Sequence, residues 1–346
     1  MEKLNLSALN LPTKAIPSVI DRKSSRGYVN WGKDNKLPQY LFDTYLGCSE
    51  LQSLVNTISD YILGAGIESN YSLESDNGDT LEEVIQKCIL DYVLFGGFSV
   101  ECIRNKVEQV VRVNYVNVMN IRVDEALTTA YISNEWNTWS ARDLVTLPLF
   151  NKKKQQAHFI LYYRGSLTRN INPIPIWFSG LKSAETLIET RNFNLNNITN
   201  NFSANGMLAL NGVELSQEEL KRVTEEVESN YSGSDNAGRI IVVNNPNQEG
   251  KVEFTRLQPD NTADLYAALQ ENATNDLYVS FRINKMLVGQ NVQTGFSQME
   301  FENAYKLFDA TVIKPLQNNI RKVFEQIGIE IEFKPFKIDW SDGTIQ

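Results

Sequence analysis

Apolar residues recur every three or four positions in six stretches of the chain, which predicts six helices. These stretches cover about 51–62, 81–95, 179–205, 216–231, 260–283 and 297–327. Capping-box spacing marks four helix starts, in the pairs Ser49 and Gln52, Thr80 and Glu83, Ser216 and Glu219, and Ser297 and Glu300. Pro315 lies inside the last stretch. We expect it to kink or split that helix, because proline has no backbone N–H and crowds the preceding turn.

The apolar period changes to that of β-strands elsewhere. Strands are predicted at 98–103, 109–115, 157–163, 207–210, 239–243, 251–257 and 329–333. Residues 1–175 therefore indicate an α+β domain. The second half indicates a helix, a small α/β insert at 206–257, a helix, a glycine-containing loop and a long helix. Its first helix carries an apolar seam that suits side-by-side packing, at Leu181, Ile188, Leu195 and Phe202.

Charge limits the possible partners. The formal net charge is −9, so any contact with DNA is expected to be local or loose. Residues 1–40 are polar and locally basic, and they form an arm that lies on its own domain or reaches a neighbouring subunit. Lys152, Lys153 and Lys154 are expected in a solvated turn. The insert contains nine acids and five bases, a net charge of −4, and an acidic conduit would let DNA slide.

The sequence contains no catalytic constellation or phosphate-cradling P-loop. Its single histidine, His158, falls in a strand-like run, which favours a structural role and excludes a metal site with several histidines. Cys48, Cys88 and Cys102 fit no metal spacing and are expected to be free thiols. There is no signal-peptide pattern and no apolar run long enough to span a membrane. We therefore expect a cytoplasmic protein without cofactor or metal.

The order of motifs resembles the portal proteins of tailed bacteriophages. Residues 31–38 (WGKDNKLP) resemble the family's Gly-x-Asp-Asn-x-x-Pro segment, and 91–99 resemble its helix-to-strand step with a pair of small residues. Further similar segments are 62–66, the proline-rich stretch 172–177 that leads into a channel helix, 202–206 at that helix's end, and Lys314-Pro315. The resemblance covers nearly the whole chain.

The resemblance implies a portal-like α+β fold. Its parts would be a wing at 1–175, stem helices at 176–205 and 258–283 that bracket a clip at 206–257, a tunnel loop at 284–298, and a kinked C-terminal helix and strand at 299–346 with a short or absent crown. The tunnel loop would contact DNA through Lys285, Gln290, Asn291, Gln293 and Thr294. The clip would bind partners through a charged helix face, unless that face is only solvated, at Glu218, Glu219, Glu225, Glu226 and Glu228.

The resemblance also implies a function without catalysis. A homo-oligomeric, usually dodecameric ring would sit at the capsid vertex of the virion after assembly in the host cytoplasm. It would conduct double-stranded DNA without sequence preference during packaging and ejection. Its partners would be the large terminase subunit, a head–tail adaptor, and the major capsid and scaffolding proteins.

Three alternatives stay open. The chain could be another ring-forming head–tail connector, although two stem helices bracketing an insert argue against this. It could be a metal-dependent nuclease, although no diagnostic carboxylate motif is present. The segment 284–298 could be an ordinary connection, although at fifteen residues it is longer than most.

Overall fold

The chain folds into two compact units in a computed structural model. One comprises 1–46, 52–178 and 284–346, and the other comprises 47–51 and 179–283. The structure describes residues 16–72, 74–136, 141–165, 170–199, 206–211, 216, 218–219, 221–223, 240–245, 252–256, 262–289 and 298–336.

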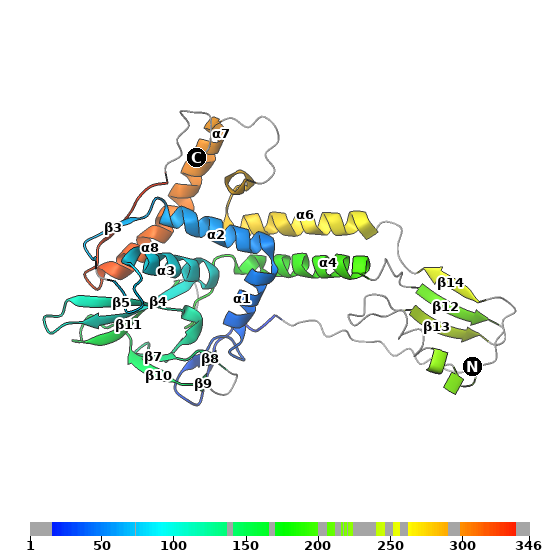
Figure 1. The fold of residues 1–346 in the computed structure, drawn as a ribbon, viewed down its shortest axis with the longest axis horizontal. Coiled ribbons are helices and arrows are strands. Elements are labelled where there is room, and N and C mark those ends of the chain that lie inside the picture. Colours follow the sequence, from blue (N-terminus) through cyan, green and yellow to red (C-terminus); the bar gives the residue numbers. More distant parts are fainter. Residues whose placement is uncertain are drawn as a thin grey trace. The chain divides into compact units, whose positions relative to one another are not determined.

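The first unit is built around helix α3 (Leu81–Phe95) and a three-stranded antiparallel sheet (Figure 1). The sheet has the order β11 (His158–Arg164), β4 (Gly97–Arg104), β5 (Val110–Val116). Most of α3 is buried, including Val84, Cys88 and Phe95. The predicted strands at 98–103, 109–115 and 157–163 are therefore confirmed within one or two residues, because their alternation is a local signal.

Shorter elements surround this core. A second sheet has the order β10 (Val145–Pro148), β7 (Thr129–Ile132), β6 (Ile121–Val123). Two-stranded pairs are β1 (Arg22–Lys23) with β2 (Val29–Asn30), β8 (Glu135–Trp136) with β9 (Ala141–Arg142), and β3 (Ile67–Ser69) with β15 (Ile331–Phe333). The last pair joins segments far apart in sequence, so residues near 331 complete the fold begun near 67.

Two helices precede α3 in the chain. They are α1 (Leu37–Gly47) and α2 (Ser49–Leu63). The sequence did not predict α1, because Pro38 suggested a break; in the structure Pro38 occupies the first turn, where proline is tolerated. Ser49 is the first residue of α2 and follows Cys48, so the cap predicted at Ser49 is shifted by one residue.

The long C-terminal helix is split, as Pro315 predicts. Helix α7 (Gln298–Phe308) is followed by a π-helical turn (Asp309–Ile313) and helix α8 (Lys314–Glu325). The N–H of Lys314 donates to the carbonyl of Asp309, so the turn is widened immediately before the proline. The buried face of α8 is formed by Leu316, Ile320, Val323 and Phe324.

The second unit contains two long helices and a small sheet. Helices α4 (Leu181–Thr199) and α6 (Thr262–Phe281) lie side by side (Figure 1). Strand β12 (Gly206–Asn211) pairs in parallel with β13 (Ile240–Asn245) and antiparallel with β14 (Glu253–Arg256). The predicted mixture of helix and sheet is thus confirmed. Among the described residues, no helix is long and apolar enough to cross a membrane.

Candidate functional site

Helices α4 and α6 lie in the two segments predicted as stem helices, 176–205 and 258–283. The rings of Phe193 and Tyr266 lie 4.6 Å apart between centroids, and Ser183 Oγ donates to Asp276 Oδ2 at 3.3 Å. Gly180 permits close approach at one end of the pair, because a Cβ there would lie 2.6 Å from Ser280 Oγ. The two helices therefore pack along much of their length.

The seam predicted on α4 is only partly correct. Leu181 is buried, but Leu195 is 62% exposed, and Phe202 lies outside the described residues. The buried face instead follows Leu181, Ala184 and Leu187, at the three-residue spacing of a straight helix. Leu195 stays within about 40° of Leu181 around the helix axis, so it lies on the same face of α4 but is not covered there by the described residues.

The start of α2 is tied to α4 within the second unit. The guanidinium of Arg191 forms an ion pair with Glu50 Oε1, and Cys48 Sγ lies 3.6 Å from Glu50 Oε2. Burial is the largest single influence on the pKa of Glu50 and would raise it, but the hydrogen bond from Arg191, the charge of Arg191 and the hydrogen bonds from the backbone and Ser49 together lower that pKa. Glu50 is therefore held ionised as an anchor for α4.

The residues of the predicted clip that the structure describes have different roles. Glu219 closes a capping box, accepting the Ser216 N–H at 2.9 Å while its own N–H donates to Ser216 Oγ at 3.3 Å. This predicted cap is confirmed. Glu218 is exposed, and Glu225, Glu226 and Glu228 lie outside the described residues. Binding of partners by these five carboxylates stays a prediction.

The predicted tunnel loop begins as an anchored 3-10 turn, η3 (Lys285–Val288). Asn284 Oδ1 caps it by accepting from the Met286 N–H at 3.0 Å, and Tyr61 Oη donates to the Leu287 carbonyl at 2.9 Å. Leu287 is buried and Lys285 is half-buried, so this part packs within its own chain. Gln290, Asn291, Gln293 and Thr294 lie outside the described residues, and their DNA contact stays a prediction.

Three of the segments that carried the resemblance meet at one junction. Asp21 accepts the Gly32 N–H at 3.1 Å through Oδ1, and the N–H groups of Ile171 and Asn172 at 2.8 and 2.9 Å through Oδ2. Asn35 Oδ1 accepts from the Trp31 N–H at 3.0 Å and from Arg122. One carboxylate thus joins the segments 31–38 and 172–177.

The glycine pair Gly96-Gly97 completes this junction. Gly96 has φ +86°, and a Cβ there would lie 2.2 Å from the Ile174 carbonyl oxygen. Trp177 Nε1 donates to the Val93 carbonyl at 3.0 Å. The segment 172–177 is therefore held against the end of α3, and only glycine fits the left-handed, crowded position.

Arg122 also belongs to this junction, although its sequence context does not predict it. Its side chain is buried, donates to the carbonyls of Met119 and Ile121, and lies over the ring of Trp136 at 4.7 Å. Burial lowers the pKa of Arg122 to about 9. No local pattern marks such a residue, because its partners come from separate segments.

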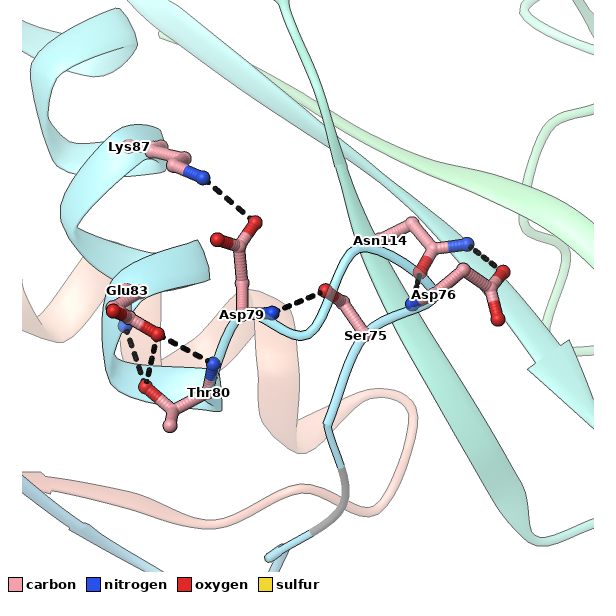
Figure 2. Close-up of polar contacts among 7 residues, drawn as sticks. All are labelled: Ser75, Asp76, Asp79, Thr80, Glu83, Lys87 and Asn114. Atoms are coloured by element: carbon pink, nitrogen blue, oxygen red, sulfur yellow. Dashed lines mark hydrogen bonds and ion pairs between the residues drawn. The ribbon is translucent and has the colours of Figure 1, made fainter.

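A polar network fixes the loop before α3 (Figure 2). Ser75 Oγ accepts the Asp79 N–H at 2.9 Å, and Asp79 pairs with Lys87 at 2.7 Å. Asn114 on β5 accepts the Asp76 N–H at 2.9 Å and donates to Asp76 Oδ2 at 2.7 Å. These groups satisfy one another, so the network orients α3 on the sheet.

Among the residues that the structure describes, no group of three or more His, Cys, Asp or Glu side chains is placed to bind a metal ion.

Two further predicted features lie in this unit. The capping box of Thr80 with Glu83 is confirmed. His158 lies exposed on β11 with Nε2 2.6 Å from Glu101 Oε1 on the neighbouring strand. A cross-strand pair of this kind is a structural contact.

Comparison with known proteins agrees with this architecture. Three similar structures share the fold at low sequence identity. The virion of a native gene transfer agent particle contains a chain with a TM-score of 0.59 and 14% identity, covering 90% of this chain and 86% of that one. The neck of the native particle, computed with C12 symmetry, contains a chain with a TM-score of 0.58 and 13% identity. The match covers 92% of this chain and 87% of that one. An HK97-family phage portal protein from Corynebacterium diphtheriae has a TM-score of 0.53 and 12% identity. The match covers 85% of this chain and 94% of that one.

The sequence matches none of the curated proteins significantly. The family model described as "Phage portal protein" matches residues 73–337, which is more than half of the chain. That match spans α3, the main sheet, both long helices, the small sheet and the split C-terminal helix. The chain belongs to the phage portal protein family.

Proposed function

We propose that the chain assembles into a closed ring at the capsid vertex and conducts double-stranded DNA during packaging and ejection. This proposal rests on one observation in a chain of the portal family. The long helices α4 and α6 pack as a pair, and the small sheet lies between them in the sequence. The similar chain in the gene transfer agent neck belongs to a particle computed with C12 symmetry. A twelve-fold ring is therefore the expected assembly, and the virion its location.

A closed ring requires that one face of each subunit bind a different face of the next. The stem helices offer apolar surface for such a contact. Leu195 on α4 and Val279 on α6 are 62% and 75% exposed in the single chain. Burying such side chains between subunits is favourable because it removes apolar surface from water.

The proposed role is structural and not enzymatic. The ring would dock the large terminase subunit and later a head–tail adaptor through the clip, and it would contact the major capsid and scaffolding proteins. The clip's net charge of −4, from nine acids and five bases in 206–257, supports a conduit that repels DNA phosphates. A duplex would then slide through the ring without sequence preference.

The tunnel loop tests the conduit most sharply. Deleting 290–294 removes four of the five proposed DNA contacts and keeps η3, which is anchored by Asn284 and Tyr61. We expect normal ring formation by electron microscopy and fewer DNA-filled heads. Lys285→Ala should give a smaller loss, because an isolated charge contact is screened by salt.

A matched control replaces 290–294 by a glycine–serine segment of equal length, which separates the loss of side chains from a change of loop length. Normal head filling by the deletion variant would contradict the DNA-contact role. Loss of rings would show instead that the segment is needed for assembly.

A further inference from the structure

A basic hollow lies at one end of the main sheet, in the first unit. Its volume is about 500 Å³, and its lining includes Arg104, Lys152, Lys153 and Lys154. The only carboxylates in that lining are Glu108 and Glu325, so four cations face two acids and the local charge is +2. In a chain whose net charge is −9, this is a concentrated positive surface.

Two tight turns hold this surface in place. Strand β11 pairs with β4 so that His158 faces Ile103, and the Arg104 N–H donates to the Ala157 carbonyl at 2.7 Å. The turn from β4 to β5 is therefore fixed beside the turn that carries the three lysines. Both turns belong to the sheet that forms the centre of the unit.

The lysine turn is preorganised by its neighbours. Asn151 Oδ1 accepts the Lys153 N–H at 2.9 Å, and the Asn151 carbonyl accepts the Lys154 N–H at 3.0 Å. Gln156 bridges the base of the turn, accepting from the Asn151 N–H at 2.8 Å and donating to the Leu149 carbonyl at 2.9 Å. The backbone is thus fixed while the three lysine side chains are exposed.

Arg104 is held differently. Its guanidinium carbon lies 4.8 Å from the Phe159 ring centroid and 5.6 Å from that of Phe150, so the two rings position it. Its Nε atom is buried and has no hydrogen-bond partner among the described residues. Among the residues that the structure describes, neither Arg104 nor the three lysines form an ion pair; the lining carboxylate Glu325 pairs instead with Arg321. Clustered like charges repel one another, so an anionic ligand would lower the electrostatic repulsion among these four cations.

The chemistry of the lining favours phosphates over a protein partner. Among the described residues, Phe150 is the only apolar side chain that lines the hollow, and Arg104 lies over its ring. Protein interfaces are centred on aromatic and apolar anchors and are depleted of charge at their core. Phosphate backbones are instead bound by lysine point charges and arginine forks.

We propose that Arg104, Lys152, Lys153 and Lys154 bind the phosphate backbone of duplex DNA, at a second site separate from the proposed tunnel-loop contact. Binding at this site is independent of sequence, because the hollow presents charge to phosphates and nothing that reads base edges. The three lysines by themselves fit the predicted solvated turn. A solvated turn does not explain the half-buried Arg104 beside them.

The test measures binding of a labelled duplex of about 30 base pairs to the full-length assembled protein by fluorescence anisotropy, across a salt series. The variant replaces all three lysines, Lys152→Gln, Lys153→Gln and Lys154→Gln. We expect at least about a tenfold loss of affinity at low salt. The slope of log affinity against log salt should fall by about 2.7 if all three lysines contact phosphates.

The matched control makes the same change of charge elsewhere on the first unit, with Lys23→Gln, Lys33→Gln and Lys334→Gln, which are all exposed. It should bind almost as the parent does. Arg104→Lys keeps the charge but loses the planar fork, so it should weaken binding less than the lysine variant. Thermal unfolding checks that each variant is folded, and microscopy checks its rings.

Three results would overturn the proposal. The lysine variant could match its control in affinity and salt slope, or the parent could fail to bind duplex at low salt. Polyglutamate of equal total charge could displace the duplex better than unlabelled duplex does, which would make the hollow a site for an acidic protein. Because ring formation is measured separately, none of these results bears on the proposed ring.

Discussion

At the scale of single residues, Asp21 makes the junction between distant segments. Its carboxylate accepts three backbone N–H groups, from Gly32, Ile171 and Asn172. Asp21→Ala should lower the free energy of unfolding by about 3 kcal/mol, because hydrogen bonds to a charged group are strong and their donors become unsatisfied. Denaturant unfolding measures the loss. Asp43→Ala is the matched control, since Asp43 is exposed and accepts only from Gln39 among the described residues; an equal loss would contradict the role given to Asp21.

Asp91 predicts a dependence of stability on pH. It is fully buried on α3, where it accepts from Tyr115 Oη at 3.0 Å and the Val118 N–H at 2.9 Å, and burial raises its pKa from 3.8 to about 7. Between these two values the folded chain holds one more proton than the unfolded chain. Stability should therefore fall as pH rises from about 4 to 7, by up to about 4 kcal/mol, and this contribution should be constant above that range.

The variant Asp91→Asn removes this titration. Unfolding free energies measured at pH 5 and pH 7.5 should then differ less for the variant than for the parent. A parent and variant with equal pH dependence would show that Asp91 is ionised in the folded chain throughout.

At the scale of elements, the turn from α3 to β4 shows why one glycine matters more than another. Gly96 and Gly78 have φ +86° and +83°, so a side chain at either position would be strained by about 1–2 kcal/mol. Only at Gly96 would a Cβ meet a backbone atom, the Ile174 oxygen at 2.2 Å, while nothing lies within 4 Å at Gly78. Gly96→Ala should therefore lower the melting temperature clearly more than Gly78→Ala. Equal losses of melting temperature would show that the segment 172–177 moves away from the new Cβ without a loss of stability.

Elements whose signals are local were predictable from the sequence. The caps of Thr80 with Glu83 and Ser216 with Glu219 lie within four residues, and both form as expected. Helix α1 was missed because the position of Pro38 within a helix cannot be read without knowing where that helix begins. The short strands between 121 and 148 were missed because runs of two to four residues carry little periodicity.

The candidate site was less predictable than the fold. Lys285 was expected in a loop but is half-buried in an anchored turn, because Tyr61, far away in sequence, binds the carbonyl of Leu287. Arg122 and Asp21 carried no signal at all, since their partners are set by tertiary structure. The seam on α4 ends in the exposed Leu195, because an apolar repeat marks one face of a helix but does not show how far along the helix a neighbour covers that face.

At the scale of the whole molecule, charge and assembly belong together. A chain of net charge −9 is a poor general DNA binder, yet the proposed function requires DNA to pass through the ring. The acidic clip would let the duplex slide, and the localised basic hollow would hold it. This division depends on the proposed ring.

The most direct test of the portal account is an image of the purified full-length protein viewed along its particle axis by electron microscopy. The account predicts closed rings of uniform subunit number, twelve by comparison with the gene transfer agent neck, around an open centre wide enough for a DNA duplex. Monomers alone at micromolar concentration in several salts, or particles with a closed centre, would contradict it.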